Sequence, residues 1–306
     1  MNERISTIKR SIALLAFLAA SQLPAVAHAT PYMIDEFTII KNGNLFFKDT
    51  FSDGIAPPNA GGALIGGSPA SYTVLAGGSF VAGEEANGKL LLNPTAPGAG
   101  LGSTPDGIPV NTKGAQLNTN TGGLNGLGLK SNDAFKVTAL FDLVTPAGEF
   151  PHGYRLRLSD IGPPNGGSTN ANDIALLRVQ QDGFGNTGVY FYRGDYVAET
   201  RNLLEYVLLG PEAADQIALT LSKDLAGTNA ISASFQYYNG GVAGSVFSFS
   251  AVTSLFTGED WVRADFGGIA PVAVPEPAVA LLLAAGLAGI GITRRRRFAL
   301  GRSKPS

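Results

Sequence analysis

The stretch Phe135-Lys-Val-Thr-Ala-Leu-Phe-Asp-Leu-Val144 decides the fold class of this chain. Apolar residues occupy every second position, and most of the residues between them are polar. Because successive side chains of a strand lie on opposite faces of a sheet, this alternation places Phe135, Val137 and Phe141 on one buried face. The stretch therefore predicts a strand with one face in a core and the other partly in water.

Similar segments recur along the chain and predict an all-β protein. Further strands are expected at 37–40, 45–47, 154–159, 174–180, 189–193, 203–209, 216–222, 231–238, 246–250 and 261–266. Turn residues separate them, as Asn42-Gly43 separates the first two. The Gly-, Asn- and Pro-rich region 54–130 fits either a flexible linker or a part of a sandwich with long loops. Short apolar segments at 72–75, 89–92 and 115–117 favour the sandwich.

The N-terminal end has the three parts of a secretory signal peptide. Basic residues precede an apolar segment at 12–20, and Ala27-His28-Ala29 provides a cleavage site before Thr30. We therefore expect a signal helix at residues 1–29 that signal peptidase removes. Residues 30–270 are then expected to form one β-sandwich domain of the exported protein.

The C-terminal end combines a short motif, an apolar segment and a basic cluster. Val274-Pro275-Glu276-Pro277 precedes fifteen uncharged, mostly apolar residues at 278–292, and Arg294-Arg295-Arg296-Arg297 follows. A comfortable bilayer span needs about 20 apolar residues, so this segment is short. The positive-inside bias holds the arginines in the cytoplasm. The segment is either a retained tail anchor or a part that is removed.

With Pro275-Glu276-Pro277 in this context, segment 274–297 resembles a PEP-CTERM sorting signal. The resemblance implies a transmembrane helix in the inner membrane of a Gram-negative bacterium, with residues 298–306 as a cytoplasmic tail. It also implies that an exosortase reads the motif and that the helix and basic cluster are removed. The implied destination is the cell surface or extracellular matrix. The expected sandwich resembles the concanavalin A-like jelly rolls, in architecture alone.

Composition excludes several kinds of site. Residues 30–275 contain 13 Lys or Arg and 22 Asp or Glu, a net charge of about −9, which disfavours nucleic acid and anionic membranes as partners. The chain has no cysteine, and His152 is the one histidine outside the expected signal peptide. Disulfides and a multi-histidine zinc site are therefore excluded. Neither a nucleophile-elbow motif nor the paired-carboxylate motif of jelly-roll glucanases occurs.

Aromatic and arginine side chains give the first candidate for a ligand site. Tyr190 and Tyr192 alternate with the apolar Val189 and Phe191, so they are expected on an outer face where sugars can stack on their rings. Arg155, Arg157 and Arg178 could bind sugar hydroxyl groups or uronate carboxylates. Packing within the sandwich is the alternative role, above all for the other aromatic candidates: Tyr196, Tyr237, Tyr238 and Trp261.

A second candidate is a calcium site around the Gly- and Pro-rich segment 160–173. Asp160, Asn172 and Asp173 offer hard oxygen ligands there, and such ligands in a flexible loop suit Ca²⁺. Neither an EF-hand spacing nor a nonapeptide repeat is present, and Asp and Asn are also ordinary loop residues. The sequence therefore predicts no cofactor, with Ca²⁺ as the one alternative left open.

These features predict an exported, exosortase-processed protein that is non-catalytic and exopolysaccharide-associated or adhesive. Its expected partners are signal peptidase, an exosortase, the inner membrane before processing, and exopolysaccharide. Two other classes stay open, a secreted polysaccharide-acting hydrolase and a purely structural coat protein.

Overall fold

Two antiparallel β-sheets contain all the strands that the structure describes. The computed structural model describes residues 32–55, 59–65, 68–75, 80, 84–93, 100–103, 109–118, 129–130, 132–143, 152–160, 173–181, 186–195, 200–211, 214–224, 230–254 and 261–271. Every regular element in these ranges is a strand, which confirms the predicted all-β class. The expected signal helix and transmembrane helix lie outside these ranges. Within them, no helix is long and apolar enough to cross a membrane.

The eight-stranded sheet has the order β17-β16-β15-β10-β1-β6-β5, and β2 also pairs with β1. Its strands are β1 (Tyr32–Lys41), β2 (Asn44–Asp49), β5 (Glu85–Ala86), β6 (Lys89–Leu92), β10 (Phe135–Asp142), β15 (Gln216–Lys223), β16 (Ala230–Asn239) and β17 (Val242–Ser254). Two-residue turns with positive φ join two hairpins, Asn42-Gly43 between β1 and β2 and Gly240-Gly241 between β16 and β17. Such turns match the twist of the strands they connect.

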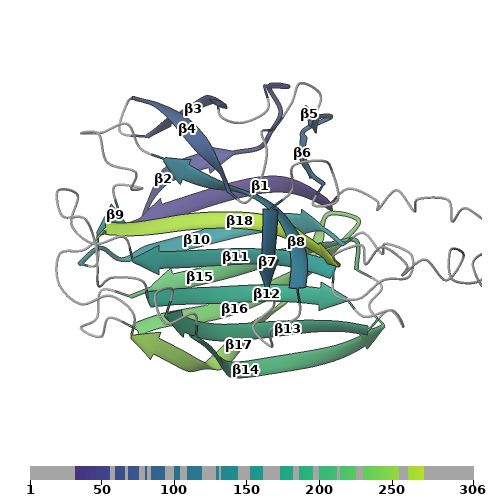
Figure 1. Cartoon of the computed structure of the whole chain (residues 1–306). Helices are drawn as coiled ribbons and strands as arrows, with labels where there is room; N and C mark the ends of the chain where they lie inside the picture. Colours follow the sequence, from purple (N-terminus) through teal and green to yellow (C-terminus); the bar gives the residue numbers. More distant parts are fainter. Residues whose placement is uncertain are drawn as a thin grey trace, which may run out of the picture. The chain divides into compact units, whose positions relative to one another are not determined.

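The ten-stranded sheet has the order β14-β13-β12-β11-β18-β8-β4-β3, with β7 paired to β8 and β9 to β18. Its strands are β3 (Asn59–Ile65), β4 (Ser68–Leu75), β7 (Gly100–Ser103), β8 (Pro109–Asn118), β9 (Leu129–Lys130), β11 (His152–Asp160), β12 (Asp173–Gln181), β13 (Asn186–Asp195), β14 (Thr200–Pro211) and β18 (Trp261–Pro271). In Figure 1, β18, β11, β12 and β13 lie in front of β10, β15 and β16. The two sheets face each other as a sandwich.

Aromatic side chains from both sheets fill the space between them. Phe37 of β1 packs on Phe266 of β18 with ring centroids 4.8 Å apart, and Phe141 of β10 stacks on Tyr154 of β11 at 4.5 Å. Burial of one such side chain stabilises a fold by about 1.5–3 kcal/mol. The core is therefore the main source of stability in a chain without cysteine.

The structure confirms most of the strands and faces that the sequence predicts. In β10, Phe135, Val137 and Phe141 are buried, whereas Lys136 is exposed. Region 54–130 contains β3 to β9, so it belongs to the sandwich. The short or glycine-rich β3, β5, β7 and β9 were not predicted, because they carry no clear alternation. They are extended because a neighbouring strand pairs with each of them.

The outermost described strand of the eight-stranded sheet, β17, contains no charged residue. An uncharged edge strand invites pairing with another chain. Two irregularities interrupt its pairing with β16, and Oε2 of Glu205 on β14 accepts hydrogen bonds from the Ala251 N–H at 2.7 Å and from Ser250 Oγ at 2.9 Å. These bonds lower the pKa of Glu205. Figure 1 shows β14 and β17 at the same edge of the sandwich, which is thus bent and partly capped.

Candidate functional site

Strand alternation places arginines and tyrosines on the outer face of the ten-stranded sheet. In β11, Tyr154 and Leu156 are buried in the core, so Arg155 lies on the opposite, outer face. In β13, Val189 and Phe191 are buried, and Tyr190 is half-buried on the outer side. The outward positions that the sequence predicts for these residues are confirmed.

Strand register brings these residues together in rows. Arg155 is opposite Arg178, Arg178 is opposite Tyr190, and Tyr190 is opposite Tyr206, which gives one row across four strands. The next row contains Arg157, Leu176, Tyr192 and Leu203. We call the following group the arginine–tyrosine face: Arg155, Arg157, Arg178, Tyr190, Tyr192 and Tyr206.

The three tyrosine rings of this face are nearly parallel. The ring of Tyr190 lies 5.9 Å from that of Tyr206 and 6.2 Å from that of Tyr192, with interplanar angles of 15° and 18°. A Cβ atom added to Gly188 would lie 2.6 Å from atoms of the Tyr190 ring. The absence of a side chain at Gly188 thus lets this ring lie over the backbone. Tyr206 is 53% exposed, whereas Tyr190 and Tyr192 are half-buried.

One buried carboxylate organises the arginines. Asp265 of β18 is fully buried; its Oδ2 accepts a hydrogen bond from Arg157 Nε at 2.5 Å, and its Oδ1 lies 3.7 Å from Arg155 Nη2. Arg263 is two positions away on the same outer face of β18. Among the described side chains of this face, a single carboxylate therefore accompanies several arginines.

The sequence did not single out Tyr206 and Asp265. Tyr206 belongs to the strand expected at 203–209, but the pairing of β14 shifts between Glu205 and Leu203, which breaks simple alternation. Among the other aromatic candidates, Tyr237 packs against the core and Tyr238 is half-buried on the other sheet. Tyr196 lies outside the described residues, and Trp261 is described only as the first residue of β18.

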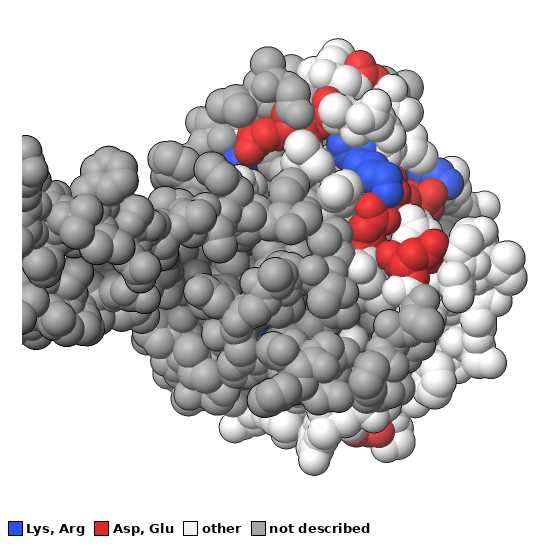
Figure 2. Space-filling model, turned by 90° about the vertical axis from the view of Figure 1, so that its right-hand side faces the viewer, with Lys and Arg blue, Asp and Glu red and all other residues white. Residues whose placement is uncertain are grey.

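A second polar group lies where β1, β6 and β10 adjoin. Lys89 Nζ donates hydrogen bonds to Asp142 and to Asp35, the latter at 3.0 Å. Burial, and then the hydrogen bond shared with Asp142, raise the pKa of Asp35 to about 6. Burial favours a higher pKa for Asp142, but hydrogen bonds from Asp35 and Lys89 outweigh it and lower the pKa. Figure 2 shows basic and acidic atoms side by side on the end of the molecule that faces right in Figure 1.

A third group of carboxyls surrounds Tyr72. The Tyr72 hydroxyl donates to Asp49 Oδ2 at 2.9 Å, and the N–H of Gly54 donates to Glu85 Oε1 at 3.1 Å. Burial, and then the hydrogen bond to Asp53, raise the pKa of Glu85 to about 8. The same hydrogen bond lowers the pKa of Asp53. Asp53 and Glu85 therefore share one proton near neutral pH.

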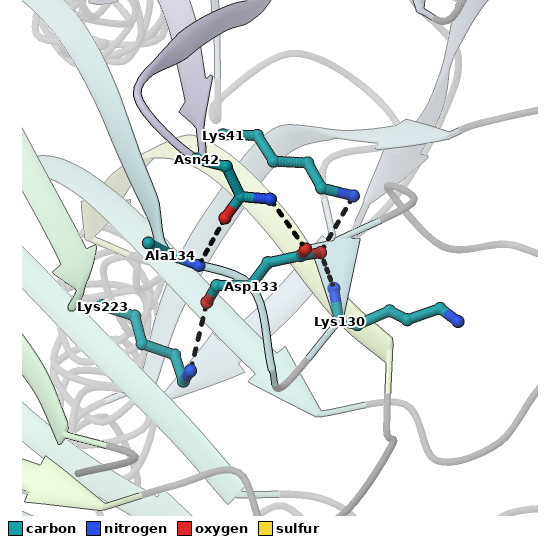
Figure 3. A network of polar contacts seen from close by, with 6 residues as sticks. All are labelled: Lys41, Asn42, Lys130, Asp133, Ala134 and Lys223. Carbon is teal, nitrogen blue, oxygen red and sulfur yellow. Dashed lines mark hydrogen bonds and ion pairs between the residues drawn. The ribbon is translucent and has the colours of Figure 1, made fainter. Parts of the chain in front are cut away.

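The contacts of Asp133 serve the fold. Its carboxylate accepts hydrogen bonds from Lys41 Nζ at 2.9 Å, Asn42 Nδ2 at 3.1 Å and the N–H of Lys130 at 2.8 Å (Figure 3). Its carbonyl oxygen accepts one from Lys223 Nζ at 3.1 Å, and burial lowers the pKa of that lysine. The network ties the β1–β2 turn to the turn before β10 and to the end of β15.

The predicted calcium ligands are only partly described. Asp160 ends β11 and Asp173 begins the neighbouring β12, so their backbones lie at one end of the sheet. Asn172 lies outside the described residues. Within the described ranges, no group of three or more His, Asp or Glu is arranged to hold a metal ion. The calcium site stays a prediction.

The residues of the two processing signals also lie outside the described residues. These are Ala27, Ala29 and Thr30, Pro275 to Pro277, and Arg294 to Arg297. No protein-family model, curated protein or solved structure matches this chain. Any functional assignment therefore depends on the chemistry of the residues described above.

Proposed function

We propose that this chain is an exported protein of the cell surface or extracellular matrix that binds exopolysaccharide without catalysis. The observation that carries the proposal is the arginine–tyrosine face, with three nearly parallel tyrosine rings beside a row of arginines. Aromatic rings stack on the C–H faces of sugars, and guanidinium groups bind hydroxyl and acid groups. The sandwich core contains its own aromatic residues, and the three tyrosines of this face are not among them.

We further propose that the sandwich is a jelly roll of the concanavalin A-like type. Two facing antiparallel sheets of many short strands support this assignment. The assignment adds little to the functional argument, because one fold serves many functions.

The proposed route to the surface follows from the chain ends. Signal peptidase cleaves before Thr30, and an exosortase of a Gram-negative bacterium processes the protein at Pro275-Glu276-Pro277 while the next segment spans the inner membrane. Replacing the three motif residues with alanine should leave the protein in the inner-membrane fraction. Unchanged release of this variant into the medium would contradict sorting through the motif.

Binding is tested by titrating the full chain with exopolysaccharide from the producing cells, with and without a calcium chelator. We expect saturable binding that Tyr206→Ala weakens about tenfold through lost stacking and apolar contact. Tyr238→Ala is the matched control, because Tyr238 is a half-buried tyrosine on the outer face of the other sheet. Loss of binding in chelator would favour the calcium site at Asp160, Asn172 and Asp173. A folded chain that binds nothing would point to a structural coat protein.

A second candidate function is polysaccharide hydrolysis, and the Asp53–Glu85 pair favours it. Two carboxyl groups whose pKa values are driven apart are the usual acid and base of such a reaction. Glu85 is 4% exposed, which restricts its contact with a substrate, so we place hydrolysis second. Reducing-sugar release that Glu85→Gln abolishes would reverse this order.

A further inference from the structure

Exposed apolar side chains are concentrated on two strands of the sandwich. Among the residues that the structure describes, nine large apolar side chains are exposed, and seven of them belong to β14 or β17. Leu45 and Ile55 are the other two. Tyr206, one of the seven, is part of the arginine–tyrosine face. We call the remaining six the apolar edge: Leu203 and Leu208 of β14, and Val242, Val246, Phe247 and Val252 of β17.

The first half of β17 is exposed on both of its faces. Residues 242–248 are all exposed, although alternation directs their side chains to the two sides of the sheet. Val246 is 59% exposed opposite Gln236, and Phe247 is 42% exposed although its ring stacks on Phe235. Further along the strand, Phe249 is buried, as expected where the second sheet covers the inner face. The described strands therefore leave 242–248 without a layer against it.

β14 and β17 end the two described sheets at the same edge of the sandwich (Figure 1). Glu205 of β14 joins them there, because its carboxylate accepts hydrogen bonds from Ser250 and Ala251 of β17. These bonds hinder the pairing of another strand along the second half of β17. The exposed side chains stay outside them. The edge thus favours a partner that packs against side chains.

The edge is large enough for a stable contact between proteins. The thirteen residues of β17 extend about 44 Å, at about 3.4 Å per residue. Two sheets about 10 Å apart, with side chains on either flank, make the edge roughly 15–20 Å wide. The resulting area is roughly 650–900 Å², and each partner of a standard interface buries about 800 Å².

The distribution of charge favours a second copy of the chain as the partner. Residues 30–275 have a net charge of about −9, so two copies repel each other over most of their surface. β17 has no charged residue, and the carboxylate of Glu205 on β14 is held by β17. Repulsion between copies is therefore smallest at this edge. Apolar side chains that meet there also leave water, which is favourable.

We propose that two copies of this chain form a dimer through the apolar edge, related by a twofold axis. In such a contact the same surface serves both partners. The described surface has one concentration of exposed apolar side chains, since Leu45 of β2 and Ile55 are the only others. The contact therefore closes at two copies and does not continue into a filament. The dimer does not depend on the proposed saccharide binding.

The first test measures the mass of the full chain in mild non-ionic detergent by sedimentation over a range of concentrations. We expect a reversible dimer with a Kd that is micromolar or tighter. Val246→Lys should weaken it at least about tenfold, because the twofold axis brings two ammonium groups to one apolar contact. Leu45→Lys, at a residue that is 65% exposed on β2, is the matched control and should leave the Kd unchanged. Added salt should not weaken the dimer, since the apolar edge contributes no ion pair.

Single cysteines locate the contact. The chain has no cysteine, so one introduced cysteine can form a disulfide only with a second copy. Val242→Cys, Val246→Cys and Val252→Cys are oxidised separately, each at a position that is more than half exposed. At least one should give a disulfide-linked dimer, because equivalent residues beside a twofold axis lie within reach of such a bond. Leu45→Cys should stay monomeric over the same time.

Three results would overturn the dimer. A wild-type chain that sediments as a monomer at the highest attainable concentration lacks the contact. A dimer that both Val246→Lys and Val252→Lys leave unchanged forms elsewhere on the chain. A mass that grows without limit as the concentration rises means open-ended association and not a twofold contact. Circular dichroism checks that each variant is folded, which the exposure of both valines leads us to expect.

Discussion

The two sheets of the sandwich manage their positive charges in different ways. In the eight-stranded sheet, individual lysines pair with acids near them, as Lys48 pairs with Glu36 at 2.6 Å and Lys41 with Asp133 at 2.9 Å. In the ten-stranded sheet, Asp265 serves both Arg157 and Arg155. The first arrangement is a set of separate ion pairs. In the second, one buried carboxylate holds two arginines, so the loss of a single side chain affects more of the network.

Removing the shared carboxylate should have the largest effect. Asp265→Ala leaves the half-buried Arg155 and Arg157 without their acid, and we expect a loss of about 3–5 kcal/mol in the free energy of unfolding. Glu36→Ala breaks a more exposed pair in the other sheet and should cost about 0–1 kcal/mol. Urea unfolding of both variants measures the difference. Equal losses would mean that the two sheets do not differ in this respect.

The pH dependence of stability tests the eight-stranded sheet. The pKa of Glu85 is raised from 4.5 to about 8 on folding, so the folded chain retains a proton that the unfolded chain has released. The contribution of Glu85 to the free energy of unfolding is complete below pH 4.5. It is lost as the pH rises towards 8, by at most about 1.4 kcal/mol per pH unit. The lowered pKa of Asp53 stabilises the fold above pH 3.8, and this contribution is lost as the pH falls below that value.

Unfolding curves between pH 4 and 9 measure this loss. Glu85→Gln should remove most of it, since glutamine does not titrate. Asp53→Asn takes away the charged partner and should move the loss to lower pH. A wild-type chain whose stability does not fall between pH 5 and 8 would contradict the shared proton.

A neutral pair on the outer face of the eight-stranded sheet should contribute less. The hydroxyl groups of Thr138 and Thr220 are hydrogen-bonded at 3.0 Å across β10 and β15. Thr138→Val should cost about 0.5–1 kcal/mol, because Thr220 loses this partner. The double replacement with valine should recover part of the loss. A single variant as unstable as Asp265→Ala would show that this face, too, depends on a polar network.

The capped edge should affect association more than stability. Glu205→Ala frees the N–H of Ala251 on the uncharged β17, and we expect a concentration-dependent increase in light scattering with an almost unchanged unfolding curve. Glu205→Gln retains an acceptor oxygen and should remain close to the wild type. A Glu205→Ala chain that stays monomeric at high concentration would show that the bulges of β17 protect it sufficiently.

Strong alternation made much of the fold predictable. Most strands from β10 onward carry apolar residues at alternate positions, and each predicted segment lies within or closely overlaps an observed strand. The glycine-rich β3 and β7 carry no such signal, because their extended form depends on the strands beside them. Strand order could not be predicted from the sequence, because no local sequence pattern indicates that β18 lies between β11 and β8.

Part of the candidate site could be predicted, namely the residues that alternate with core residues along a strand. Arg155, Arg157, Tyr190 and Tyr192 alternate with residues that the core requires, so their outward positions could be inferred. Asp265 could not be linked to Arg157, because 108 residues separate them in the sequence. The two carboxyl pairs were missed for the same reason, since their partners belong to different strands or turns of the fold.

The capped edge of β17 has a consequence for the proposed location in an extracellular matrix. Copies of a matrix protein are held close together for long times, the condition under which an open, uncharged strand grows into fibres. Here Glu205 and Tyr206 are neighbours on β14, one holding the edge of β17 and the other exposed on the outer face. A change that shifts this strand therefore acts on the proposed saccharide contact and on polymerisation together.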